Sequence, residues 1–352
     1  APVPYPPVLH SLASASTITW LIHQKFELSI PLYRQEKEWE ALGLRLSRAT
    51  MSNWLLVVYR DWLVHIVHRL KLELLKQRYL HIDETHVQVL KEPGRKNTSD
   101  SYMWVYCSIR DAVNPIRYFE YQPGRSGKYP EAFLREYEGY IHTDAYSGYN
   151  AVSGVKRCLC YTHLRRAFVD ALPKDIHNSE ASKPAEAILR LNQLFNIESE
   201  LEALPPDQKK KERLIREKPL LEAFWSWAEK SAIGELPKSK LSKAFHYALN
   251  NREGFWNYLE DGNCSISNSL AENCIRPFVI GRKNWLFSGS PKGAEASAGI
   301  YTLVETAKAN GLAPMKYIKY ILSDMPGSAF LEHPEYLDDY LPWNPLVKEF
   351  CR

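Results

Sequence analysis

The sequence lacks the features that would assign it to several specialised classes of protein. It contains no apolar run of about 18 residues, so we expect no membrane-spanning helix. The formal net charge is only +4, which by itself is weak evidence for a nucleic-acid partner. We find no internal repeat and no long low-complexity tract.

Cysteine is also scarce. The six cysteines stand at positions 107, 158, 160, 264, 274 and 351, a spacing unlike that of a secreted disulfide framework. A chain of 352 residues with 45% hydrophobic content can build a large core without such bridges. We therefore expect a reducing, cytoplasmic environment and, from the length, two or three domains.

The N-terminal part reads as a linker followed by helices. Residues 1–7 alternate proline with other residues, which predicts an extended linker and a further segment before it. Residues 31–42 predict a helix that Gly43 ends, and Ser47 can cap a second helix that runs to about Gln77. This order resembles a helix-turn-helix, with an ordinary helical hairpin as the alternative.

The next part predicts a mixed α/β domain with a helical insertion. Strands are expected at residues 79–90, 102–109, 115–121 and 140–144, with a short helix at 129–137 before the last strand. Residues 164–262 lack strand signals and predict an inserted helical segment. A helix over 267–276 should end at Pro277. Helices at 294–309 and 314–322 follow, separated by the C-cap pair Asn310-Gly311.

Three carboxylates form a candidate metal site. Asp83 lies in the first strand, Asp144 ends the fourth, and Glu272 lies on the helix over 267–276, with Asn268 and Arg276 one turn to either side. Carboxylates within strands are costly to bury unless they meet a cation, and oxygen ligands suit Mg²⁺ or Mn²⁺. Two such ions activate an attacking hydroxyl and stabilise the leaving oxygen of a phosphodiester.

Ordinary strand-end carboxylates are the alternative explanation, because the chain has 41 acidic residues. Glu84 also competes with Asp83. Strand alternation places these two side chains on opposite faces, so only one of them can serve. The nearby histidines His81, His86 and His142 receive no catalytic role, since most single histidines are structural.

A family resemblance rests on motifs around these acids. The matching stretches are residues 31–36, 46–50, 81–85, 142–149, 160–166, 268–290, 306–311 and 341–344, and the stretch around Glu272 is the most specific. On these motifs the chain resembles the bacterial insertion-sequence transposases of the family numbered sixty-six. The resemblance covers nearly the whole chain.

The resemblance implies an RNase H-like catalytic core with a helical insertion before the final glutamate. It implies DNA transposition, with Asp83, Asp144 and Glu272 as catalytic residues and Mg²⁺ ligands, and Mn²⁺ as a substitute. Members usually carry a cysteine-rich N-terminal region before the part matched here. The implied partners are element-end and target DNA, a second copy in a homodimeric synaptic complex, and accessory proteins of the element. The implied location is the cytoplasm, near the nucleoid.

Other motif residues are expected to position the site or to hold DNA. Cys160 and His163 form a Cys-x-x-His motif with a positional role; a zinc site with Cys158 is the alternative, although a fourth ligand is not evident. Cations and an aromatic near the acids are candidate phosphate and base contacts, with surface charge beside a core tryptophan as the alternative. The candidate DNA contacts are Arg165, Arg166, Arg276, Arg282, Lys283 and Trp285.

These expectations give a five-part organisation. We predict an N-terminal helical DNA-binding region at residues 1–77, the first part of the catalytic core at 78–163, the insertion at 164–262, the second part of the core at 263–325 and a tail at 326–352. Two other functions remain open from the sequence. One is an RNase H-like nuclease without strand transfer, and the other is a non-catalytic DNA-binding protein derived from a transposase.

Overall fold

The computed structural model describes residues 5–173 and 182–352 and divides the chain into two compact units. Unit 1 comprises Ala1–Gln77, Asp83–Tyr129 and Ala271–Arg352, and unit 2 comprises Arg78–Ile82 and Pro130–Leu270. Residues 1–4 of the predicted linker and residues 174–181 of the predicted insertion lie outside the described residues. Among the described residues, no helix has the length and apolar content needed to cross a membrane.

Unit 1 begins with a run of helices, the first of which the sequence did not predict. They are α1 (Ala15–Ile22), α2 (Leu32–Ala41), α3 (Arg48–Val58) and α4 (Val64–Leu75), with π-helical turns at His23–Glu27 after α1 and at Tyr59–Leu63 between α3 and α4. Gly43 adopts a φ of +85° in the turn after α2, a conformation that favours glycine. The Ser47 hydroxyl accepts from the Thr50 amide and caps α3. The predicted break and cap are therefore confirmed.

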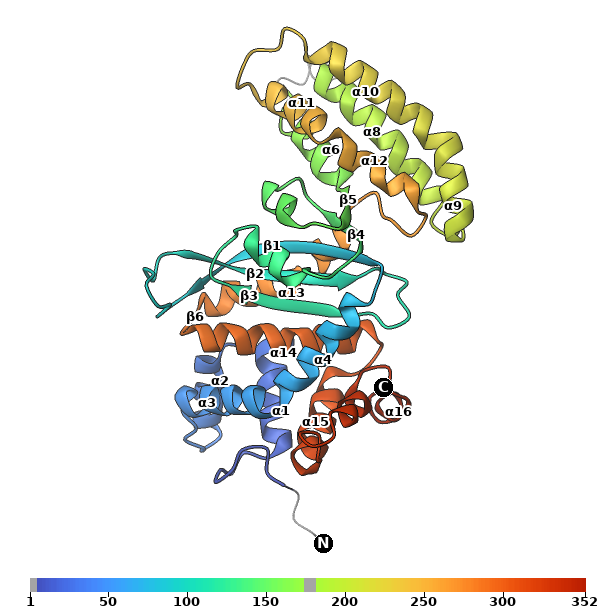
Figure 1. The fold of residues 1–352 in the computed structure, drawn as a ribbon. Helices are drawn as coiled ribbons and strands as arrows, with labels where there is room; N and C mark the ends of the chain where they lie inside the picture. Colours follow the sequence, from blue (N-terminus) through green and yellow to red (C-terminus); the bar gives the residue numbers. More distant parts are fainter. Residues whose placement is uncertain (1–4, 174–181) are drawn as a thin grey trace. The chain divides into compact units, whose positions relative to one another are not determined.

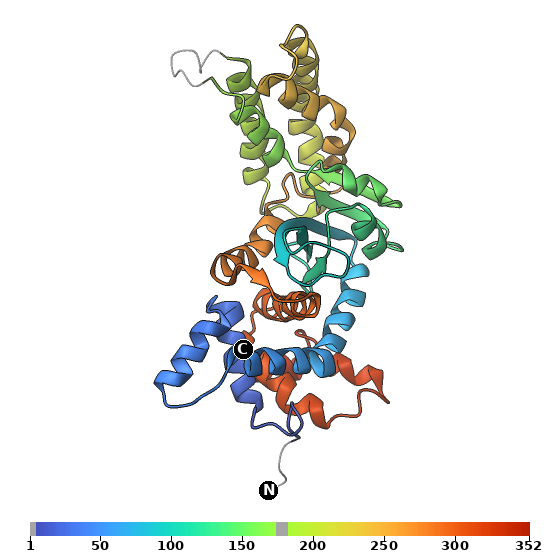
Figure 2. The same ribbon diagram turned by 90° about the vertical axis from the view of Figure 1, so that its left-hand side faces the viewer.

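The strands of unit 1 pack on one long helix, α14 (Pro291–Ala309). Strands β2 (Asp100–Ser108) and β3 (Arg117–Gln122) pair antiparallel, and β6 (Phe287–Ser288) pairs parallel with the end of β1 (Tyr79–Val89). Two threonines of α14 accept hydrogen bonds from β3 amides, Thr302 from Phe119 at 2.8 Å and Thr306 from Arg117 at 3.0 Å. Figure 1 shows α14 running along β3, and Figure 2 shows the same helix nearly end-on beside the sheet.

The remaining helices of unit 1 are α13 (Ser269–Trp285), which enters it from unit 2, α15 (Pro314–Asp324) and α16 (Pro345–Cys351). Short 3₁₀ turns lie at Met325–Gly327 and Pro334–Tyr340. Residues of α14 are small where other elements come close: a Cβ on Gly299 would lie 2.1 Å from the ring of Tyr59. The predicted C-cap pair is confirmed, because Asn310 ends α14 and Gly311 has a φ of +71°.

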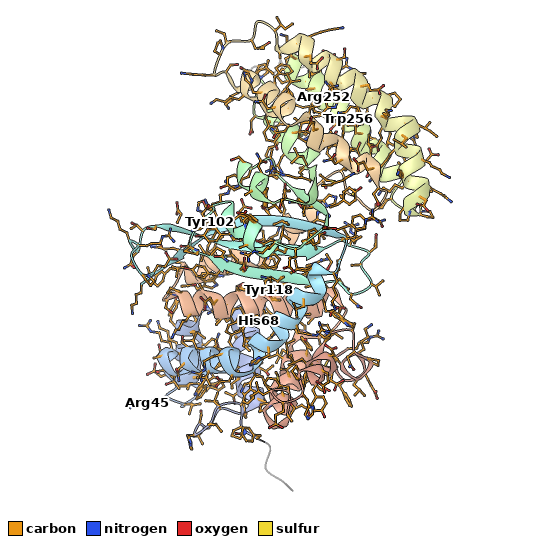
Figure 3. The ribbon with its side chains drawn as sticks, in the orientation of Figure 1. Arg45, His68, Tyr102, Tyr118, Arg252 and Trp256 are labelled. Carbon is orange, nitrogen blue, oxygen red and sulfur yellow. The ribbon has the colours of Figure 1, made fainter. Side chains whose placement is uncertain are left out.

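Unit 2 joins three parallel strands to a group of helices. The start of β1 pairs with β4 (Gly139–Thr143), and β4 pairs with β5 (Val155–Leu159). The helices are α5 (Lys128–Phe133), α6 (Tyr161–Val169), α8 (Lys183–Glu200), α9 (Pro206–Glu212), α10 (Lys218–Ala232), α11 (Lys240–Asn250) and α12 (Arg252–Trp256), with 3₁₀ turns at Ser147–Ala151 and Asn257–Glu260 and a π-helical turn at Arg213–Glu217. Their aromatic core includes Phe168, Phe224 and Trp225. Figure 3 labels Arg252 and Trp256 on α12.

The strands follow the order β3-β2-β1-β4-β5, and β6 pairs with β1. Parallel and antiparallel pairs both occur, so the prediction of a mixed α/β fold is confirmed. Strand β5 was not predicted from the sequence. This strand contains Lys156 and Arg157 and pairs with β4, and such a charged strand lacks the alternating apolar pattern that signals a strand.

The predicted end of the glutamate helix at Pro277 is wrong. Helix α13 continues through Pro277 to Trp285. A proline inside a helix removes one backbone hydrogen bond, but its fixed φ is still helical. Beyond the proline, Phe278 packs edge-to-face against Trp285 and Tyr301, with ring centroids 5.3 and 5.5 Å apart. We infer that this burial offsets the lost bond.

Candidate active site

Asp83 lies inside β1 and is half-buried. Its Oδ1 accepts a hydrogen bond of 2.9 Å from the amide of Glu84. The competing carboxylate of Glu84 accepts from the Arg125 guanidinium at 2.6 Å, and the Glu84 side chain is only 2% exposed. The charge of Glu84 is therefore balanced by a cation of the protein.

Asp144 directly follows β4 and is also half-buried. Its Oδ1 accepts from the Tyr146 amide at 2.9 Å, an arrangement that starts a turn. Arg157 of β5 fixes the same loop, because its guanidinium donates to the carbonyl of Asp144 at 2.6 Å and to that of Tyr146 at 2.8 Å. The arginine also donates to the Thr143 hydroxyl at 2.7 Å. Four backbone or side-chain contacts thus hold the chain at Asp144.

Glu272 is the fourth residue of α13 and is half-buried. A carboxylate in the first turn of a helix interacts favourably with the unpaired amides and the positive end of the helix dipole. Glu272 and Asp83 belong to unit 1, whereas Asp144 belongs to unit 2. A metal site that combines the three carboxylates therefore stays a prediction.

Three buried polar side chains of unit 2 contact one another. One comes from β1, one from β4 and one from the residue directly before α13. The rings of His81 and His142 stack with centroids 4.2 Å apart. His81 Nδ1 lies 2.9 Å from Asn268 Oδ1, and the side-chain Nδ2 of Asn268 donates to the Ile82 carbonyl at 2.7 Å. His142 Nδ1 lies 3.1 Å from the Leu80 carbonyl. We call His81, His142 and Asn268 the strand-end network.

The strand-end network gives structural partners to two of the histidines that received no catalytic role. His86, the third, is exposed, and its ring lies 4.5 Å from that of Tyr102 on β2. Tyr102 is labelled in Figure 3. Asn268 directly precedes α13, although the sequence predicted a helix that begins at residue 267 and includes Asn268. No local pattern identified this network, because its members come from distant parts of the sequence.

Cys160 and His163 lie at the start of α6. Cys160 is the N-cap residue of that helix, and its Sγ accepts a hydrogen bond from the backbone amide of Asn268 at 3.1 Å. This contact joins α6 to the strand-end network and fits a positional role for the cysteine. Within the described part of the chain, Cys158 groups with His142 and Cys264 as possible metal ligands, and not with Cys160 and His163.

The candidate DNA-contacting residues differ in exposure. Arg166, Arg276 and Lys283 are exposed. Arg165 donates to Asn192 at 2.7 Å, and Arg282 donates to Thr85 at 3.2 Å. Burial lowers the pKa of Arg282. The exposed three are therefore the better placed to meet a phosphate.

Trp285 is half-buried, and its ring packs edge-to-face against Phe278. The face-on stacking of a base needs an open ring face. Through this packing Trp285 contributes to the core of unit 1. Its contact with DNA stays a prediction.

Comparison with known proteins places the chain in a family. The profile described as "Transposase IS66 family" matches residues 10–296. Three similar proteins of Sinorhizobium fredii are the uncharacterized proteins y4hP, y4qI and y4jD, which are 26%, 28% and 25% identical to this chain over 97%, 95% and 98% of its length. The chain spans 64%, 63% and 68% of these relatives. Because the profile covers most of the sequence, the chain belongs to the IS66 family of transposases.

Proposed function

We propose that the chain is a DDE transposase that cleaves DNA at the ends of its insertion element and joins them to target DNA. Asp83, Asp144 and Glu272 are the proposed ligands of two Mg²⁺ ions, with Mn²⁺ as a substitute. Family membership supports the transposase role. The strand-end network is the observation that supports the choice of these three carboxylates.

Each proposed ligand follows a member of this network closely along the chain. Asp83 directly follows Ile82, whose carbonyl accepts a hydrogen bond from Asn268. Asp144 comes two residues after His142. Glu272 comes four residues after Asn268, about 6 Å along a helix. An extended chain spans at most about 3.3–3.6 Å per residue, so fixing the network limits where the backbone at each acid can lie.

The donor set fits Mg²⁺. All three side chains offer only carboxylate oxygens, the ligands that this ion prefers, and all three are half-buried, where a cation offsets the cost of removing their charge from water. When bound, two Mg²⁺ ions would activate the attacking water or 3′-hydroxyl and stabilise the leaving oxygen. The chain's own contribution is orientation. The amides of Glu84 and Tyr146 each hold one carboxylate oxygen, of Asp83 and Asp144 respectively.

The DNA partner has candidate contacts in both units. Exposed Arg166 of unit 2 follows Cys160 on α6, and exposed Arg276 and Lys283 of unit 1 follow Glu272 on α13. Such side chains bind phosphates without reading sequence. The turn between α2 and α3 is exposed as well and carries Arg45, which Figure 3 labels, followed by exposed Arg48 at the start of α3. This surface suits the proposed helix-turn-helix-like contact with element ends.

The remaining parts of the proposal follow from family membership. The strands and α13 form the RNase H-like core, and two copies of the chain pair two element ends in a synaptic complex. Accessory proteins of the element take part, and the complex works at the nucleoid in the cytoplasm. The relatives also contain sequence that this chain does not match, and the proposal assigns no function to that part.

The test uses the protein and a DNA duplex that carries the sequences flanking its own gene. We expect Mg²⁺-dependent nicking and, with pre-cut 3′-hydroxyl ends, joining to a target plasmid. Asp144→Asn should abolish both reactions, and Glu131→Gln, which alters an exposed acid, should retain both. Binding of Mn²⁺, measured by its electron paramagnetic resonance signal, should fall in Asp144→Asn independently of any DNA reaction.

The outcomes separate the alternatives. Nicking without joining would support the nuclease, and DNA binding with neither reaction would support the non-catalytic DNA-binding protein. If Asp144→Asn nicks DNA and binds Mn²⁺ as well as the parent does, the proposed metal site is wrong.

A further inference from the structure

A second cluster of possible metal ligands lies in unit 2, apart from the three carboxylates. His142 of β4, Cys158 of β5 and Cys264 in the loop before α13 place one ring nitrogen and two sulfurs within 4.8 Å of one another. Each of the three side chains is only 1% exposed. His142 and Cys158 are direct partners in the β4–β5 register, so the sheet itself fixes two of the three positions.

We propose that His142 Nε2, Cys158 Sγ and Cys264 Sγ bind a Zn²⁺ ion. Sulfur and imidazole are the ligands that Zn²⁺ prefers, in contrast to the oxygen set proposed for Mg²⁺, and a water molecule would complete the four ligands of the tetrahedron. Zn–S bonds of about 2.3 Å in a tetrahedral site place two sulfurs about 3.8 Å apart. The observed separation of at most 4.8 Å can reach that value through a shift of about 1 Å or less.

The tautomer of His142 suits a metal ligand. Its Nδ1 faces the Leu80 carbonyl at 3.1 Å, and a carbonyl only accepts, so this nitrogen carries the proton. Its Nε2 accepts from the Ser265 amide at 2.8 Å and therefore presents a lone pair. A backbone carbonyl on the second nitrogen is the usual support of a metal-bound histidine. When Zn²⁺ binds to Nε2, it replaces the hydrogen bond from the Ser265 amide. Ser265 belongs to the same short loop as Cys264.

The two cysteines also suit this role. They hydrogen-bond to each other, so their two sulfurs already lie side by side. On binding, the sulfurs release their remaining protons to solvent, and no group is oxidised or reduced. Two thiolates, a neutral imidazole and Zn²⁺ sum to zero charge. A buried assembly of that charge avoids the penalty of an isolated buried ion.

The position of the cluster gives the ion a structural task. Cys158 lies just before α6, and Cys264 lies just after the last turn of the inserted helices. The ion would join the point where the chain leaves the sheet to the point where it returns. Closing such a long loop removes conformational freedom from the unfolded chain and so stabilises the folded unit.

The test measures zinc in the full chain, purified under reducing conditions from cells grown with Zn²⁺. We expect about one Zn²⁺ per chain in the parent and a loss of most of it in Cys158→Ser and Cys264→Ser. Cys107→Ser is the matched control. Cys107 is buried and hydrogen-bonded to Cys274, but this second pair has no grouped histidine among the described residues.

A second measurement covers variants that fail to fold. Co²⁺ added to the zinc-stripped parent should give the intense near-ultraviolet absorption of thiolate-bound cobalt. Added Zn²⁺ should remove this absorption and raise the melting temperature in a concentration-dependent way. Zinc-free protein without a cobalt spectrum would overturn the proposal, as would unchanged zinc content in both serine variants or a Cys158–Cys264 disulfide in protein isolated without reductant.

Discussion

The rings of His81 and His142 lie nearly parallel, at 11° to each other, where β1 and β4 pair in register. Each Nδ1 faces an oxygen, that of Asn268 or that of Leu80, so both rings are fixed in rotation as well as in position. Since all of these groups are buried, each depends on its partner for its hydrogen bond. The Asn268 side chain makes two of these bonds, to His81 and to the Ile82 carbonyl.

We expect Asn268→Leu to destabilise the protein severely. Leucine has a similar volume but leaves His81 Nδ1 and the Ile82 carbonyl buried without a partner, at about 1–3 kcal/mol each. Chemical unfolding would measure the loss. Asn196→Leu is the control, because Asn196 of α8 is exposed and should change stability by about 0.5 kcal/mol or less. An equally small effect of Asn268→Leu would show that the network does not hold these strands together.

Asp83→Asn and Glu84→Gln should have opposite effects. Asp83→Asn removes a proposed metal ligand, so Mn²⁺ binding and DNA nicking should be lost. Glu84→Gln weakens the charged bond with Arg125 and should lower stability by about 1–3 kcal/mol. Its Mn²⁺ binding should persist. The reverse pattern would assign the metal ligand to Glu84.

Local signals in the sequence predicted much of the fold. Ser47 and Gly43 act within their own turns, so the α2–α3 boundary was predictable from a few residues. The local rule failed at Pro277, because the packing of Phe278 on Tyr301 involves residues far along the chain. It failed at β5 because that strand's charged residues follow no apolar alternation.

In the candidate site, too, local motifs were predictable and long-range contacts were not. Asp83, Asp144 and Glu272 stand in compact motifs, so each is recognisable as a candidate within one stretch of sequence. The contacts of Asn268 with His81 and the grouping of Cys264 with His142 depend on strand register and on how the chain returns from the insertion. Neither relationship has such a local signature.

Exposed cations should contribute to DNA affinity without affecting sequence preference. Arg276→Ala and Lys283→Ala should each weaken binding to all duplexes alike and reduce the slope of log affinity against log salt by about one. Arg282→Ala should change that slope less, since Arg282 is half-buried and bonded to Thr85. Fluorescence anisotropy at several salt concentrations measures these slopes. Unchanged slopes for Arg276 and Lys283 would remove both from the DNA surface.

Arg213→Leu should disrupt the helices of unit 2. This fully buried guanidinium donates to Glu198 at 2.5 and 2.8 Å and to the Cys264 carbonyl at 2.8 Å. Removing one partner of a buried ion pair costs about 3–5 kcal/mol because the other charge stays buried. Arg216→Leu is the matched control, because its pair with Glu200 is more exposed and such surface pairs contribute little to stability. Similar hydrogen-exchange protection of α8 and α10 in both variants would contradict this prediction.

Glu217 should make the stability of unit 2 depend on pH. Its carboxyl accepts from the Tyr258 hydroxyl at 2.6 Å and lies near Glu198. Burial and then the charge of Glu198 raise the pKa of Glu217 to about 8, from an ordinary 4.5. The folded state therefore holds a proton that the unfolded state releases. This contribution is complete below about pH 4.5, declines as pH rises and is lost above about pH 8.

Urea unfolding between about pH 5 and pH 8 should show stability falling with pH, by at most about 1.4 kcal/mol per pH unit from this group. Glu217→Gln should flatten the dependence, since glutamine keeps the bond from Tyr258 but cannot ionise. Glu222→Gln, an exposed change on α10, should leave the slope as in the parent. Glu198 does not mimic this effect, because burial raises its pKa but the bonds from Arg213 outweigh burial and lower it. Its titration belongs below about pH 4.5, so equal slopes in the parent and Glu217→Gln would mean that Glu217 is ionised in the folded chain.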